Sequence, residues 1–257
     1  MSLYECDVAI IVVTDIEEGA LKHMYDWTPL YLSNDEQLYF ESEFFRDGKK
    51  RRVVYGRQSE MGMTAAATLT TKLVLHFKPR YVFMVGVAAG IAPKDLEEQI
   101  YGDVIVADVI WNYSSGKYVS RERADIHFGE LGFVPRPTMI KMKGDMRAYV
   151  EAAAKSDENQ CHVHIGPIAS GNSVVANNEI LNKQIRSQLT HTAGLDMEAY
   201  AVVYAVENAI LPKPTAFVIK SVCDYADSQK SDQYQKFAAF TSAEFGKLLY
   251  EKFLPLD

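Results

Sequence analysis

Acidic and glycine-rich segments stand at five places along this 257-residue chain. Four of them follow apolar runs and one opens a segment rich in small residues; they cover residues 15–18, 86–90, 170–178, 194–199 and 220–227. Carboxylates at such places can transfer protons or accept hydrogen bonds from a bound molecule. Each segment also has a purely structural interpretation, because acidic residues stabilise helix N-termini and glycines form tight turns. A functional argument therefore depends on their combination.

The apolar runs predict strands that alternate with helices. We expect strands at 8–14, 81–87, 103–111, 163–170 and 215–222, and a hairpin that pairs 38–43 with 52–57 around Asp47 and Gly48. Apolar residues at helical spacing predict helices at 64–77, 142–155, 178–189, 199–209 and 233–253. This alternation indicates a mainly parallel sheet covered on both faces, in which ligands bind at the carboxyl ends of strands. The five segments should lie there.

Composition and charge exclude several classes of protein. The net charge of −7 disfavours binding to nucleic acid, and the one dense basic run, residues 49–52, belongs to the predicted hairpin. Three separated cysteines, Cys6, Cys161 and Cys223, lack the CxxC spacing of a zinc site, so we expect reduced thiols and no metal. Apolar runs are too short to cross a membrane, and charge interrupts the apolar start. A cytoplasmic protein is expected.

The segments belong to a longer series of motifs. In chain order these are the acidic segment 15–18, SEMGMTAAA (59–67), GVAAGIAP (86–93), YGDVIVAD (101–108), SGNSVV (170–175), LDMEAYAV (195–202) and KSVCDYAD (220–227). In this order they resemble the motifs of the nucleoside phosphorylase superfamily, particularly its 5′-methylthioadenosine/S-adenosylhomocysteine nucleosidase branch. The resemblance covers nearly the whole chain. It implies a single α/β domain over residues 4–257, with three α/β/α layers and a mixed, mainly parallel sheet.

The resemblance also implies roles for individual residues. Asp224 becomes the acid that meets N7 of a purine, and Glu198 and Met197 become the hydroxyl clamp and the floor of the ribose. Cleavage of an N-glycosidic bond needs such a proton donor at the base and negative charge near the developing ribosyl cation. Further substrate-binding positions implied by the motifs are Val174, Val175, Ala88 and Cys223. No cofactor is expected.

The base that activates water lies in the first acidic segment. The family places a glutamate there in the pattern E-x-x-(A or L)-(L or V), which this chain satisfies from Glu17. An alignment without a gap selects Glu18 instead. We favour Glu17, and one of the two glutamates is expected to be only a first-turn helix residue stabilised by the helix dipole.

Two departures from the family pattern bear on the reaction and the substrate. Relatives that use phosphate bind it with Arg and Ser or Thr where this chain has Met84 and Val87, so hydrolysis is favoured over phosphorolysis unless another arginine such as Arg57 approaches. The stacking Phe of the base loop is Val174 here, which removes an aromatic contact unless Tyr225 replaces it. A phosphorylase and a catalytically weakened nucleoside-binding module remain alternatives.

The expected partner is a small-molecule purine nucleoside, with 5′-methylthioadenosine and S-adenosylhomocysteine as candidates. A homodimer is also expected, because enzymes that this sequence resembles complete the sugar pocket with a loop from a neighbouring subunit. Residues 128–133 (FGELGF) are the candidate loop.

Overall fold

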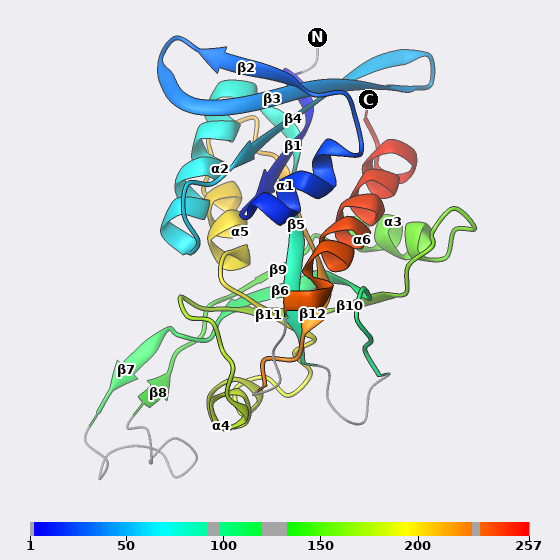
Figure 1. Ribbon diagram of the computed structural model, residues 1–257. Coiled ribbons are helices and arrows are strands. Elements are labelled where there is room, and N and C mark those ends of the chain that lie inside the picture. Colours follow the sequence, from blue (N-terminus) through cyan, green and yellow to red (C-terminus); the bar gives the residue numbers. More distant parts are fainter. Residues whose placement is uncertain (1–2, 92–97, 120–132, 228–231, 257) are drawn as a thin grey trace.

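The computed structural model describes residues 3–91, 98–119, 133–227 and 232–256. Within this part of the chain, a large sheet runs in the order β11-β10-β6-β12-β5-β1-β4-β3-β2, and β9 pairs with β6 (Figure 1). Its strands are β1 (Cys6–Val12), β2 (Thr28–Leu32), β3 (Asp35–Arg46), β4 (Lys49–Arg57), β5 (Pro79–Gly90), β6 (Val104–Asn112), β9 (Met139–Lys141), β10 (Val163–Ser170), β11 (Gly194–Asp196) and β12 (Thr215–Asp224).

The sheet is mixed, as expected. Strand β1 pairs in parallel with β4 and β5, β5 pairs in parallel with β12, and β10 pairs in parallel with β6 and β11. By contrast, β12 is antiparallel to β6, and β11 is antiparallel to β5. Because β11 bonds to both β10 and β5, it brings the ends of these two strands together.

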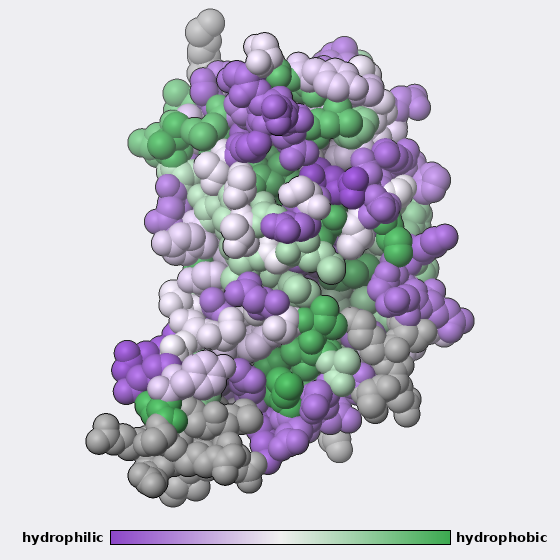
Figure 2. All heavy atoms as spheres, turned by 60° about the vertical axis from the view of Figure 1, so that its left-hand side comes forward, coloured by the Kyte–Doolittle hydropathy of each residue, from purple (hydrophilic) through white to green (hydrophobic). Residues whose placement is uncertain are grey.

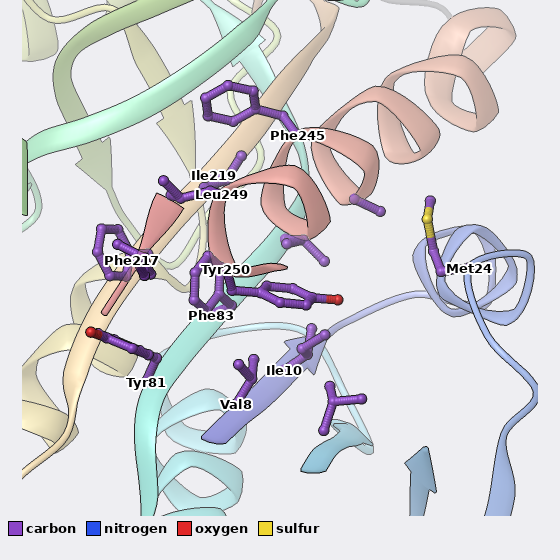
Figure 3. Packing of buried hydrophobic residues seen from close by; sticks show 14 of the residues in the cluster. Val8, Ile10, Met24, Tyr81, Phe83, Phe217, Ile219, Phe245, Leu249 and Tyr250 are labelled. Carbon is purple, nitrogen blue, oxygen red and sulfur yellow. The ribbon is translucent and has the colours of Figure 1, made fainter. Parts of the chain in front are cut away.

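Helices cover both faces of the sheet. One apolar core packs α1 (Asp15–Lys22), α3 (Gly144–Ala154) and α6 (Gln235–Leu248) against one face. The other core packs α2 (Met63–Phe77) and α5 (Ala199–Glu207) against the opposite face. Figure 3 shows the first core, where Val8 and Ile10 of β1, Phe83 of β5 and Phe217 of β12 meet Tyr250. Three layers around a mainly parallel sheet confirm the predicted fold class.

The predicted hairpin is confirmed as β3 and β4. Asp47 and Gly48 both adopt positive φ, at 52° and 72°, which suits the two-residue turn between twisted strands. Ten strand and helix predictions, including those of the hairpin, lie within a few residues of observed elements. Two predicted helices change type along their length: 178–189 becomes α4 (Asn178–Ile180) followed by the π-helix η2 (Leu181–Arg186), and 233–253 becomes α6 followed by the π-helix η4 (Leu249–Phe253).

Several short elements escaped sequence reasoning. These are β2, β9, β11 and a separate ribbon of β7 (Gly116–Tyr118) and β8 (Phe133–Pro135), which projects from the body in Figure 1. None is long enough to show a strong hydrophobic period. Helix α1 begins in the acidic segment where a first helical turn was expected, and the 3₁₀ turn η3 (Asp232–Tyr234) overlaps the start of the predicted helix 233–253. The three cysteines are free thiols, as expected. Among the described helices, none combines the length and the apolarity needed to span a membrane.

Candidate active site

A cavity of about 150 Å³ opens where the carboxyl ends of β1, β5 and β12 meet β11 and the start of α5. All eight site residues predicted from the sequence line it: Glu17, Ala88, Val174, Val175, Met197, Glu198, Cys223 and Asp224. They come from five separate segments of the chain. The fold thus brings these residues together at the edge of the sheet where a ligand was expected. The remaining described lining residues are Val13, Thr14, Met61, Val87, Ala89, Ser173, Leu195, Asp196, Lys220 and Gln235.

Glu17 is fixed in the cavity by backbone amides. It forms a capping box with Thr14 at the start of α1: Thr14 Oγ1 accepts a hydrogen bond from the Glu17 amide, and Glu17 Oε2 accepts one from the Thr14 amide at 3.1 Å. The same oxygen accepts from Val13 N at 2.7 Å, and Oε1 accepts from Val87 N at 2.9 Å. A carboxylate offers about four acceptor positions, so about one remains for a bound water.

Gly86 makes this arrangement of Glu17 possible. Its φ is +150°, and a Cβ built on it would lie 1.9 Å from Glu17 Oε1. Any larger residue would therefore displace the carboxylate from the Val87 amide of β5.

Glu18 points away from the cavity. It accepts a hydrogen bond from Tyr55 on β4 and forms ion pairs with Lys22 and Arg57. Arg57 also pairs with Asp15 at 3.0 Å and does not line the cavity. The structure thus places Glu17 in the cavity, Glu18 in a surface ion-pair network, and the candidate anion-binding Arg57 in that same network.

Glu198 lies at the N-cap of α5 and is 5% exposed. Its Oε1 accepts a hydrogen bond from Gly62 N at 2.7 Å, across from the start of α2. Burial and the charge of Asp196 raise the pKa of Glu198 from 4.5 to about 7, although the Lys220 charge and the Gly62 amide oppose the shift. A carboxyl group with this pKa changes its charge near neutral pH.

Lys220 and Asp196 form a buried ion pair beneath the cavity that sequence reasoning missed. Lys220 Nζ lies 3.6 Å from Asp196 Oδ2, and both side chains are almost fully buried. Asp196 also accepts hydrogen bonds from Ser170 Oγ at 2.7 Å and from Ala199 N. Burial disfavours the ammonium, but the charges of Glu17, Asp196 and Glu198 outweigh burial, and the pKa of Lys220 is raised. One signal in the sequence could have indicated this pair: Lys220 is the first residue of the KSVCDYAD motif, and the family pattern also has a basic residue there.

Asp224 reaches the cavity through an irregularity in β12. Val222 pairs with Ala88 and Asp224 pairs with Ala89, so Cys223 is an extra residue in the ladder. Successive strand residues normally face opposite sides, yet Cys223 and Asp224 both line the cavity. Asp224 Oδ1 accepts a hydrogen bond from Ala226 N at 2.9 Å, and Ala226 adopts a φ of 55°. Asp224 therefore also shapes the following turn.

Tyr225 and Met84 do not lie where the sequence analysis placed them, at the cavity. Tyr225 is directed elsewhere, because its ring packs on Tyr101 and its hydroxyl donates to Gln99 O, so among the described lining residues no aromatic ring replaces the missing Phe. Met84 lies in the core beside α2 and α5, so only Val87 of the two apolar replacements faces the cavity. Val174 is 56% exposed at the rim, together with Met61 at 61%.

Substitution of Lys220 by Met should destabilise the fold strongly. The variant leaves Asp196 and its carboxylate neighbours buried without their cation, a loss of about 3–5 kcal/mol in the free energy of unfolding. Lys22→Met is the matched control, because Lys22 forms an exposed ion pair with Glu18 and its loss should cost less than about 1 kcal/mol. Urea unfolding of both variants measures the difference. Equal stabilities would contradict the role of Lys220.

The raised pKa of Glu198 predicts a specific pH dependence of stability. Between pH 4.5 and about 7 the folded protein holds a proton on Glu198 that the unfolded chain has released. The free energy of unfolding from this residue therefore rises as the pH is lowered through this window, by at most about 1.4 kcal/mol per pH unit. Glu198→Gln should lack this component, whereas Glu36→Gln, at an exposed position, should retain it. Urea unfolding at several pH values tests this, and parallel curves for wild type and Glu198→Gln would refute it.

Two curated proteins are similar to this chain over most of its length. An uncharacterized protein of Sinorhizobium fredii is 28% identical over 93% of this chain and 60% of its own length. The ATP nucleosidase Cap17 of Escherichia coli is 26% identical over 94% of this chain and 50% of its own length. The chain thus spans about half the length of these curated relatives.

A solved structure shares the fold. The 5′-methylthioadenosine/S-adenosylhomocysteine nucleosidase of Neisseria meningitidis, in complex with methylthio-immucillin-A, superposes with a TM-score of 0.74 at 23% identity. The similarity covers 95% of this chain and 98% of that one. The model of the phosphorylase superfamily matches residues 7–251. With nearly its whole length matched, this chain belongs to the phosphorylase superfamily.

Proposed function

We propose that this protein hydrolyses the N-glycosidic bond of a purine nucleoside, within one domain that spans residues 4–257. The observation that carries the proposal is the meeting of three buried carboxyl groups, Glu17, Glu198 and Asp224, in one cavity. They come from α1, from the N-cap of α5 and from the end of β12, which are far apart in the sequence. Simple binding of a nucleoside would not need both a proton donor and a water base.

Each of these three carboxyl groups has a different role in the proposed reaction. Asp224 gives a proton to N7 of the purine as the bond from N9 to C1′ of the ribose breaks, so that the base leaves as a neutral molecule. Glu17 takes a proton from water, whose oxygen forms the new bond to C1′. Glu198 accepts hydrogen bonds from the ribose hydroxyls, while Met197 contacts the sugar. The negative charges of Glu17 and Glu198 also favour the cationic sugar in the transition state.

Glu17 favours water over phosphate as the nucleophile. Its Oε1 already accepts the hydrogen bond from Val87 N, the amide at the glycine turn of β5 that faces the cavity. A phosphate dianion would have to compete for this amide and would lie beside the carboxylate. Lys220, the one cation among the described lining residues, is already paired with Asp196. Water carries no charge and needs only the base.

Two observations bear on the 5′ substituent of the substrate. The exposed apolar side chains of Met61 and Val174 at the rim favour an uncharged group such as the methylthio group of 5′-methylthioadenosine. The similarity to the E. coli ATP nucleosidase over 94% of this chain favours ATP. Both substrates have the same base and glycosidic bond, so the proposed chemistry covers either one.

Cleavage should proceed without phosphate and release the free sugar. The purified protein is incubated with 5′-methylthioadenosine, S-adenosylhomocysteine, adenosine and ATP, each with and without phosphate. Chromatography then identifies the base and the sugar product. We expect a free ribose derivative at a rate that added phosphate does not increase. Strict dependence on phosphate, with ribose 1-phosphate as product, would establish a phosphorylase instead.

Asp224→Asn should reduce the rate of turnover by roughly 10²–10⁴-fold while nucleoside binding largely survives. Asn retains the acceptor that bonds Ala226 N, so the turn is preserved, but Asn cannot deliver a proton. Asp227→Asn, in the same loop but outside the described cavity lining, is the control and should keep its activity. Steady-state rates and calorimetric affinities are measured on each folded variant. Wild-type turnover of Asp224→Asn would leave Asp224 with only its structural role.

We also propose a homodimer that covers the rim of the cavity. The exposed residues of α2 carry no charge, and Tyr204 of α5 is exposed on the neighbouring helix; the residues on α2 are Thr64, Thr68, Thr71 and Leu75. Met61, which precedes α2, joins this face to the cavity. Figure 2 brings this side of the molecule forward and shows pale and green residues over its middle. The candidate loop 128–133 lies outside the described residues except for Phe133, which is buried against Tyr118.

Light scattering should give twice the 28.9 kDa mass of the chain. Leu75→Asp places a charge on the exposed apolar side chain of α2 and should shift the protein toward monomer with reduced activity. Phe45→Asp, at an exposed apolar position on β3, is the matched control and should remain dimeric. A fully active wild-type monomer would rule out the dimer.

A further inference from the structure

Asp103, His162 and His164 form a compact cluster that is separate from the cavity residues. Asp103 Oδ2 lies 2.8 Å from His164 Nε2 and 3.3 Å from His162 Nδ1. The three candidate ligand atoms lie within 4.8 Å of one another. Two imidazoles and one carboxylate are therefore directed at a common point.

The sheet itself creates this convergence. Asp103 directly precedes β6, and His162 and His164 stand at the start of β10, which pairs with β6 in parallel. Val104 N donates to His162 O at 2.8 Å and fixes the two strand starts in register. Residues two apart on a strand face the same side, so both imidazoles reach the same carboxylate. His164 thus lies within β10, and Asp103 and His162 directly precede the paired strands β6 and β10.

We propose that this cluster is a binding site for a divalent transition metal ion of the Zn²⁺ class. Ligand atoms about 2.0–2.1 Å from a tetrahedral Zn²⁺ are about 3.3 Å apart, and the distances from Asp103 Oδ2 to the two imidazole nitrogens lie within about 0.6 Å of that value. Imidazole and carboxylate ligands are those that Zn²⁺ accepts, whereas Mg²⁺ and Ca²⁺ prefer oxygen alone. Three protein ligands leave a fourth position for water or another molecule.

Burial and accessibility both suit a metal. The Asp103 side chain is 4% exposed and that of His164 is 13% exposed, while His162 is 46% exposed and leaves a path from solvent. Ile100 N donates to the liganding oxygen of Asp103 at 3.0 Å and holds the carboxylate in its orientation. The ligands are thus ordered before the ion arrives.

The cluster is connected to the cavity through the backbone. Gly102 N donates to Val222 O at 2.9 Å, and Val222 N donates to Asp103 O at 2.9 Å. Val222 lies two residues before Asp224 on β12. A metal ion on Asp103 would therefore stabilise the segment that supports the end of β12.

Calorimetric titration of the full chain with Zn²⁺, and optical titration with Co²⁺, test the site directly. Both titrations use the Cys161→Ser background, because the Cys161 thiol adjoins His162 and could bind metal itself. We expect one ion per chain, a visible Co²⁺ spectrum of low coordination number and a higher Tm when Zn²⁺ is present. His164→Gln should weaken affinity by at least about tenfold and remove the Tm increase.

His191→Gln is the matched control, because His191 is an exposed histidine outside the cluster, and it should bind as the background protein does. His162→Gln provides a second ligand variant at a more exposed position, should His164→Gln fail to fold. Absence of stoichiometric binding to the background protein would overturn the proposal, as would equal affinity in the background and both ligand variants. Because the readouts are binding and Tm, the result is independent of nucleoside hydrolysis.

Discussion

The ion pair between Lys220 and Asp196 allows a group of carboxylates to remain inside the protein. Buried carboxylates without compensation are expensive, and Glu17, Asp196 and Glu198 interact with one another and with the same ammonium. Backbone amides provide the rest of the compensation: Val13, Thr14 and Val87 donate to Glu17, and Gly62 donates to Glu198. The strand ends around the cavity are arranged so that these backbone donors face the carboxylates.

This requirement explains why a mixed sheet suits the site. Strand β12 carries Lys220 in its interior and Asp224 at its end, and it bonds to β5 on one side and β6 on the other. Its central position buries Lys220 completely, while its carboxyl end reaches the cavity. Strand β11 then brings Asp196 and the start of α5 toward β5 through antiparallel pairing. Lys220 thus lies in the core of the sheet, whereas Asp196 and Asp224 lie at the ends of their strands.

The sequence predicted the fold and eight of the eighteen described lining residues of the cavity, because both predictions depend on local patterns. Apolar runs located the central strands, and motif order located the residues at their ends. Distinguishing Glu17 from Glu18 was harder, since the two differ by one helical position, and only the capping box with Thr14 directs Glu17 inward. The Lys220 and Asp196 pair joins distant segments and shows no local period. The π-helical ends of two predicted helices also have no distinct apolar spacing.

Tertiary context decided the roles of the aromatic and apolar neighbours too. Tyr225 follows Asp224 directly, yet the turn at Ala226 and the ring of Tyr101 carry it away from the ligand. Met84 and Val87 lie on the same strand but face different surroundings, one the core and the other the cavity. Position in a motif alone could not show which of these side chains faces the cavity, because the direction of each depends on backbone twist and on packing against other elements.

The extra residue at Cys223 divides β12 into a part that packs in the sheet and an end that places Asp224 in the cavity. Up to Val222 the register of β12 is set by its neighbours and by the core, so changes there disturb the whole sheet. Beyond it, the pairing resumes with an offset of one residue, so that Asp224 lies opposite Ala89. A shift of the irregularity by one residue would move the acidic side chain by about 3.3 Å along the cavity without altering the buried strand. Evolution can in this way adapt the cavity to different ligands while the interior stays unchanged.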